Sequence, residues 1–180
     1  MDKLIKIQCA DNPAIMLRSI GDADQENLRT WKNMHRTSFF YQEIITPKQQ
    51  KEWFGKYLGR QHDYMFIVEE VMGKDAEEER HPIGCLAFRK EDDNTIDLYN
   101  IIRGQQSVHV TMKDAMHLML NYIKVHFPDQ RIKCDVLKDN PAVLWYKKCG
   151  FAILEEKEYY IMGIEQADIP CIEIVCREEE

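Results

Sequence analysis

The segment DNPAVLWYKKCGF, residues 139–151, constrains the fold most because chemical signals mark both ends of a short helix within it. Asn140 is a favoured N-cap residue, and Pro141 suits the first turn of a helix. Gly150 is placed for the left-handed conformation in which many helices end. The segment therefore predicts a helix over residues 141–148, with a strand directly after it.

Upstream of this segment, a longer helix is predicted between two strands. Its apolar residues recur at three- and four-residue steps, as expected for a helix that packs on a core. They are Met112, Ala115, Met116, Met119, Leu120, Ile123 and Phe127. Thr111 begins this helix and Pro128 ends it. Thr95–Ile102 before it and Ile132–Val136 after it have the composition of strands.

The remaining elements complete a mixed sheet. Further strands are expected at Leu17–Ile20, Tyr64–Val68, Ile83–Phe88, Phe151–Leu154 and Cys171–Cys176, and further helices at Asp22–His35 and between the capping residue Thr46 and the stop at Gly59. Their order predicts an α/β (α+β) fold with one mixed sheet of roughly six to seven strands and about four helices.

Three charged stretches are expected to lie outside the core. Residues 72–82 are expected to form an exposed hairpin loop between two strands. Glu69 and Glu70 are expected to be solvated at a strand end. The tail from Arg177 onward is expected to be disordered.

Composition and charge exclude several classes of function. The chain has 180 residues, 44% of them hydrophobic, which suffices for one sizeable core. The net charge of −7 and the absence of a basic stripe argue against a nucleic-acid partner. The N-terminal apolar stretch is too short for a signal peptide or membrane span, and the dispersed cysteines form no CxxC motif, so a reducing, cytoplasmic location is expected. The histidines show no metal-ligand spacing, so no metal is expected.

The segment that begins at Asn140 resembles the N-x-x-A-x-x-x-Y-x-x-x-G-F signature near the end of GNAT acetyltransferases, with the alanine offset by one position. The stretches LRSIGDADQENLRTWKN and ITPKQQKEWFGKYL are similar to the first strand, first helix and second helix of that fold. Together these segments cover about residues 16–163. The resemblance implies a single GNAT domain over residues 1–180, with splayed middle strands and an acidic C-terminal tail.

The resemblance also implies where a cofactor binds. In GNAT enzymes, acetyl-CoA lies in a V between two splayed strands, which here are Thr95–Ile102 and Ile132–Val136. Its pantetheine arm pairs with strand backbone. This places the cofactor along Asn100, Ile101 and Ile102.

Two side chains of the signature segment receive roles from the same resemblance. The tyrosine that matches Tyr146 protonates the departing thiolate, and a phenol can do so because its ordinary pKa exceeds that of a thiol. The asparagine that matches Asn140 contacts the cofactor arm. The alternatives are a core tyrosine with one buried hydrogen bond and a simple N-cap asparagine. For Asn140, the two roles are compatible with each other.

A second cofactor contact is expected where a loop enters the longer helix, because helix N-termini offer free N–H groups and a positive dipole end to a pyrophosphate. The expected cofactor-binding residues there are Arg103, Ser107, Val108, His109, Thr111, Met112 and Lys113. The alternative is a solvated loop with a capping interaction between Thr111 and Asp114. GNAT enzymes usually carry Q/R-x-x-G-x-G/A here, whereas Thr111 and Lys113 occupy the glycine positions, so side chains reshape the approach of phosphate to the backbone.

A general base is needed because an amine acceptor must lose a proton during attack on a thioester. Asp97 and Tyr99 share one face of their predicted strand, which makes them the candidates. For Asp97, the alternative is a cross-strand polar pair.

These inferences predict an N-acetyltransferase that moves acetyl from acetyl-CoA to a primary amine of a small molecule, with an amino sugar favoured by resemblance. Phe39, Phe40, Tyr41 and Trp53 are candidates for lining the acceptor pocket, with core packing as the alternative for Trp53. Two other functions remain open: acetylation of protein N-termini, as in ribosomal-protein acetylating members, and a non-catalytic CoA-binding module. The residues determine neither the acceptor amine nor the oligomeric state, for which a homodimer is one option.

Overall fold

The computed structural model describes residues 4–73, 78–91 and 94–179. Part of the expected hairpin loop, residues 74–77, lies outside the described residues, as does Glu180 at the end of the acidic tail. In the described ranges no helix combines the length and the apolarity needed to cross a membrane.

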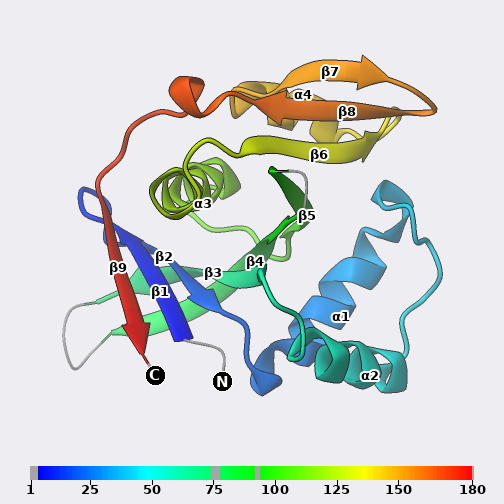
Figure 1. Ribbon diagram of the computed structural model, residues 1–180. Helices are drawn as coiled ribbons and strands as arrows, with labels where there is room; N and C mark the ends of the chain where they lie inside the picture. The colour runs from blue at the N-terminus through cyan, green and yellow to red at the C-terminus, as the bar shows by residue number, and fades with distance from the viewer. Residues whose placement is uncertain (1–3, 74–77, 92–93, 180) are drawn as a thin grey trace.

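Helices and strands together form one mixed α/β unit (Figure 1). The described helices are α1 (Gln25–Met34), α2 (Pro47–Tyr57), α3 (Met112–His126) and α4 (Ala142–Lys148), with short 3₁₀ turns at 22–24, 36–38 and 166–168. The strands are β1 (Leu4–Cys9), β2 (Ile15–Ser19), β3 (Asp63–Met72), β4 (Glu79–Lys90), β5 (Thr95–Arg103), β6 (Arg131–Leu137), β7 (Ala152–Glu156), β8 (Tyr159–Ile164) and β9 (Ile174–Glu179).

All nine described strands belong to a single sheet with the order β7-β8-β6-β5-β4-β3-β2-β1-β9. Every neighbouring pair is antiparallel except β5 and β6. The mixed sheet is therefore confirmed, but the expected count of six to seven strands was too low. The unexpected strands are β1 and β8. The turn between β7 and β8 consists of Lys157 and Glu158, which lack the glycine or asparagine that signals a tight hairpin.

The expectation of a disordered tail is wrong for the described residues. Ile174–Glu179 pairs antiparallel with β1, from Cys9 opposite Ile174 to Leu4 opposite Glu179. The charged side chains of Arg177 and Glu178 suit this position because β9 is an edge strand, where solvent covers one side. The N-terminal and C-terminal segments thus lie side by side (Figure 1).

Beta strands β5 and β6 pair at only three positions, from Thr95 opposite Arg131 to Asp97 opposite Lys133. Beyond these positions the two strands separate, which confirms the predicted splay of the middle strands. Helix α3 lies in the angle between β6–β8 and the rest of the sheet (Figure 1). This position explains its composition, because both sides of the helix meet strands. The residues of α3 with no solvent exposure are Ala115, Met116, Leu118, Met119, Leu120 and Ile123.

Helices α1 and α2 cover the opposite face of β3, β4 and β5 (Figure 1). Their buried anchors are Trp31 and Phe54, which pack with Met65 and Ile67 in a second apolar cluster. The start of α2 confirms the predicted capping box, since Thr46 Oγ1 accepts from the N–H of Gln49 at 3.3 Å.

Strand β5 contains a β-bulge, and side chains on its two sides pack in the two apolar clusters. Ala87 lies opposite Tyr99, and Cys85 lies opposite Ile102, so two residues of β5 face one residue of β4. Asn100 adopts the left-handed conformation within the bulge, with φ of 48°. As a result, Ile101 packs toward α3 while Ile102 is buried toward α1.

The contact between α1 and the end of β5 predicts opposite effects for two glycine substitutions. A Cβ at Gly104 would overlap the Trp31 indole, whereas a Cβ at Gly55 in α2 would meet nothing within 4 Å. We expect Gly104→Ala to lower the free energy of unfolding by about 1–3 kcal/mol. Gly55→Ala, the matched control, should raise it by about 0.5–1 kcal/mol. Urea unfolding of both variants tests this, and equal effects would contradict the packing.

Candidate functional site

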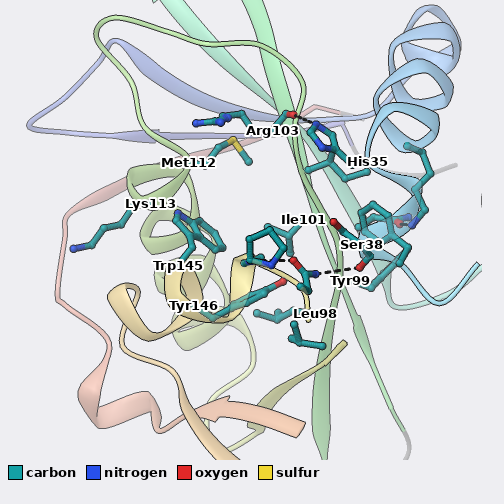
Figure 2. Close-up of a pocket in the computed structure, with 18 of the residues that line it drawn as sticks. His35, Ser38, Leu98, Tyr99, Ile101, Arg103, Met112, Lys113, Trp145 and Tyr146 are labelled. Atoms are coloured by element: carbon teal, nitrogen blue, oxygen red, sulfur yellow. Dashed lines mark hydrogen bonds between the residues drawn. The ribbon is translucent and has the colours of Figure 1, made fainter. Parts of the chain in front are cut away.

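A cavity of about 1150 Å³ occupies the fork where β5 and β6 separate. Its walls come from β5, the β5–α3 loop, the start of α3, β6, α4 and the segment that follows α1. Figure 2 shows Trp145 and Tyr146 of α4 on one side of β5, and His35 and Ser38 on the other. The cavity therefore brings together segments that are far apart in the sequence.

Tyr146 lines this cavity although its side chain is almost fully buried. Its ring lies edge-on to Trp145 and Phe151, with centroids 5.2 and 5.5 Å away. Burial is the main cause that holds the pKa of Tyr146 well above its ordinary value, and the neighbouring Cys134 adds to the shift. The phenol at the cavity wall therefore stays protonated.

Asn140 connects two walls of the cavity. Its Oδ1 accepts from the N–H of Ala142, the first residue of α4, at 2.8 Å, whereas Pro141 occupies the N-cap position expected for Asn140. Its Nδ2 donates to the carbonyl of Ser38 at 3.0 Å. Nearby, Phe40 lies edge-on to Tyr159 of β8, with centroids 5.3 Å apart. These contacts join the segment after α1 to α4 and β8 across the fork.

Asp97 and Tyr99 both line the cavity, but each already has a partner. Arg89 donates to Asp97 Oδ2 at 2.7 Å. Burial raises the pKa of Asp97, and Arg89 opposes that shift. The hydroxyl of Tyr99 donates to the Asp63 carboxylate, and burial together with Asp63 raises its pKa. Of the two, Asp97 is better suited to accept a proton, because the Tyr99 phenolate is strongly disfavoured.

The bulge residues form the wall between these groups and α1. Asn100, Ile101 and Ile102, three of the expected cofactor-binding residues, all line the cavity. The side chain of Asn100 is held from α1, because Lys32 Nζ donates to its Oδ1 at 2.6 Å. Beyond Asp97, the edge of β5 that faces β6 has no strand partner among the described residues. Its backbone is therefore open to a ligand in the fork.

The β5–α3 loop is organised by Glu70, a residue that we expected to be solvated. Glu69 and Glu70 are instead 4% and 8% exposed. Glu70 Oε1 accepts from Ser107 Oγ at 2.7 Å and from the N–H of His109 at 3.3 Å. Ser107 Oγ in turn accepts from the N–H of Val110 at 3.0 Å. The strand-end position of Glu70 gave a misleading signal, because the loop that covers it is far away in the sequence.

The start of α3 carries the predicted capping box. Thr111 Oγ1 donates to Asp114 Oδ2 at 2.6 Å and accepts from the N–H of Asp114 at 3.1 Å. This leaves the N–H groups of Met112 and Lys113 without partners in the described part of the chain. Both residues line the cavity, and Lys113 adds a positive charge (Figure 2). The free N–H groups and the Lys113 ammonium favour an anion, whereas the negative charge of Asp114 disfavours one.

The cavity separates the expected cofactor-binding residues into two groups. Arg103, Ser107 and Thr111 lie in its wall, whereas Val108, which is 91% exposed, and His109 lie outside it. Sequence reasoning missed several wall residues, namely His35, Ser38, Gln105, Gln106 and Trp145. Of the aromatic acceptor candidates, Phe39, Phe40 and Tyr41 line this cavity, and Trp53 lines an adjoining one.

Comparison of the whole fold with solved structures gives strong matches at low sequence identity. Spermidine N-acetyltransferase from Vibrio cholerae, in complex with CoA and spermine, matches with a TM-score of 0.68 and 18% identity over 88% of this chain and 99% of that one. A domain from Methanocaldococcus jannaschii matches with a TM-score of 0.67 and 16% identity over 83% and 97%. A probable GNAT-family acetyltransferase from Chromobacterium violaceum matches with a TM-score of 0.66 and 13% identity over 86% and 84%. At these identities the matches establish the fold alone.

The sequence comparisons decide the family. No curated protein matches the chain. The family model described as acetyltransferase (GNAT) domain matches residues 14–152, which is most of the chain and includes the whole fork between β5 and β6. The chain therefore belongs to the GNAT acetyltransferase family.

Proposed function

We propose that this protein transfers an acetyl group from acetyl-CoA to a primary amine of a small molecule. The observation that carries the proposal is the fork beyond Asp97, where an unpaired edge of β5 lies in the same cavity as the protonated hydroxyl of Tyr146. Membership in the GNAT family and the CoA complex of the Vibrio cholerae neighbour support the choice of acyl donor.

The residues of the fork fit the two ends of acetyl-CoA. The open edge of β5 offers backbone groups to the amides of a pantetheine arm, along Asn100 and Ile101. The free N–H groups of Met112 and Lys113, with the Lys113 ammonium, suit a pyrophosphate. Thr111 and Lys113 replace the usual glycines. The N–H of Lys113 remains free at the helix N-terminus, whereas that of Thr111 donates to Asp114 at 3.2 Å.

Acetyl-CoA supplies a thioester, whose carbonyl carbon forms the new bond to the amine nitrogen as its bond to sulfur breaks. Tyr146 is placed to donate its proton to the departing sulfur. Asp97, whose pKa is raised by burial, is the proton acceptor that we favour for the amine. Holding amine and thioester in one cavity removes most of the entropic cost of their encounter.

The contacts across the fork favour a small acceptor over a protein N-terminus. Asn140 bonds to Ser38, and Phe40 contacts Tyr159, so the segment after α1 is tied to the opposite wall. A peptide would need an open groove at this position. An amino sugar remains our preferred acceptor of this size.

Replacement of Glu70 tests the cofactor site. Glu70→Ala removes the acceptor that orders Ser107 and His109, so we expect the Kd for acetyl-CoA to rise about tenfold. Glu52→Ala on the exposed face of α2 is the control and should leave the Kd unchanged. Isothermal titration calorimetry measures both. Failure of the wild-type protein to bind acetyl-CoA would remove the proposed function at its first step.

Replacement of Tyr146 tests the chemistry. Tyr146→Phe keeps the buried ring but removes the proton donor, so kcat should fall by about 10–100-fold while the KM for acetyl-CoA changes little. Release of free thiol across a panel of amines provides the rate. Tyr160→Phe, in β8 and outside the cavity wall, is the matched control. An unchanged rate in Tyr146→Phe would exclude Tyr146 from catalysis.

A further inference from the structure

A second cavity of about 390 Å³ adjoins the fork on the side of α1 and α2. The two cavities share Lys32, Tyr99 and Asn100 as wall residues, so they meet at the bulge of β5. Trp53 and Tyr41 add aromatic surface to the second cavity. If the fork holds the acyl donor and the reacting amine, this adjoining space is open to the remainder of the acceptor.

Lys32 carries the unbalanced charge of this cavity. Its Nζ donates to Asn100 Oδ1 at 2.6 Å and lies 3.3 Å from the centroid of the Phe39 ring. No described carboxylate forms an ion pair with it. Burial lowers the pKa of Lys32 to about 8, partly offset by the nearby Cys85. A partly buried cation with only neutral partners is destabilised electrostatically, and an incoming anion offsets that cost.

Gln50 supplies a donor without a partner. Its side chain is 6% exposed and lines the cavity from α2. Its Nε2 has no hydrogen-bond partner among the described residues. A buried amide donor left unpaired destabilises the fold, so such a group is usually satisfied by a ligand or water.

The other cations in the wall are already neutralised. Arg60 pairs with Asp63 at 3.1 Å, and Arg89 pairs with Asp97 at 2.7 Å. None of the residues recorded in the wall of this cavity is an aspartate or glutamate. The free polar groups are therefore donors, on Lys32 and Gln50, and a second ammonium group of a substrate would find no carboxylate there.

We propose that the acceptor carries an anionic group, a carboxylate or a phosphate, beside its amine, and that Lys32 and Gln50 bind this group. The inference rests on the proposed function and names its substrate class. It separates this protein from polyamine acetylation, the activity named for the Vibrio cholerae neighbour, with which it shares the fold at 18% identity. Lys32 and Gln50 are thus specificity residues that select the acceptor by charge.

A matched series of amines tests the substrate class. Ethanolamine, phosphoethanolamine and β-alanine present one primary amine with a neutral, a phosphate and a carboxylate group, and glucosamine with its 6-phosphate repeats the comparison on a sugar. Spermidine represents the polyamines. We expect kcat/KM to be at least about tenfold higher for an anionic amine than for its neutral counterpart. The free energy of a hydrogen bond to a charged group exceeds the free-energy difference that corresponds to a factor of ten. The anionic amine with the higher kcat/KM shows whether the acceptor carries a phosphate or a carboxylate. A kcat/KM for ethanolamine, glucosamine or spermidine that equals or exceeds that of the anionic amines overturns the proposal.

Binding measurements separate this proposal from the acetyl-transfer reaction itself. Calorimetric titration of the same amines into the protein saturated with CoA reports recognition without turnover. Binding of phosphoethanolamine or β-alanine, together with no detectable binding of ethanolamine, supports the anion site. If those anionic amines bind but are not acetylated, the anion site stands and only the proposed function is contradicted. Binding of neither anionic amine nor glucosamine 6-phosphate overturns the anion site.

Variants assign the anion site to its residues. Lys32→Met and Gln50→Leu should each raise the KM for the preferred anionic amine about tenfold, with kcat little changed and the KM of the neutral partner unaffected. Lys51→Met, on the exposed face of α2, is the control for charge removal. A fall in kcat at constant KM in Lys32→Met would instead place Lys32 in the chemistry and overturn its role in recognition.

The stability of Lys32→Met distinguishes lost recognition from lost fold. Because the folded-state pKa is lowered, the folded protein disfavours the charged lysine at every pH below about 8, and this penalty disappears as the pH rises toward 10.5. The melting temperature of Lys32→Met at pH 7 should therefore equal or exceed that of the wild type, with the gain shrinking toward pH 10. A large loss of melting temperature at pH 7 would show that Lys32 supports the fold, against its assignment to a ligand.

Discussion

The separation of β5 from β6 after three paired positions is the constraint on which the rest of the structure depends. Two parallel strands that diverge leave backbone groups unpaired on their facing edges, and these must be covered or used. Helix α3 fills the angle behind the fork, which explains why its central turns have no exposed side. The N-terminus of α3 then opens at the fork, where free N–H groups favour an anion. One break in strand pairing thus creates the cavity and its electrostatic character.

Polar residues hold the segments around this break in place. Glu70 orders the loop before α3, and Asn140 ties α4 to the segment after α1. Each connects elements that are distant in the sequence. By contrast, Gln50 keeps a donor that no described residue satisfies, and Lys32 keeps a charge that no described carboxylate balances, a cost in stability that is expected where a site is arranged for a ligand.

Local signals predicted local structure well. Thr46 and Thr111 were recognised as helix caps from the residues that follow them, and both form capping boxes. The failures occurred where pairing partners are remote. Strand β9 includes charged residues that suggested disorder, yet the edge of β1 pairs with them. Glu70 looked solvated because the loop that buries it begins more than thirty residues later. Gln50 and Lys32 gave no signal, since nothing in their neighbourhood along the chain reveals the cavity.

The sequence by itself determined the class of fold, the bounds of the main helices and the resemblance that led to the GNAT family. These follow from periodicity, capping and a contiguous signature, all of which act between residues close along the chain. Only the tertiary structure decided which groups share a cavity, which carboxylates are paired and which donors remain free. Burial and pairing depend on contacts between distant segments, and the charge that an active site presents to its substrate is set by those contacts.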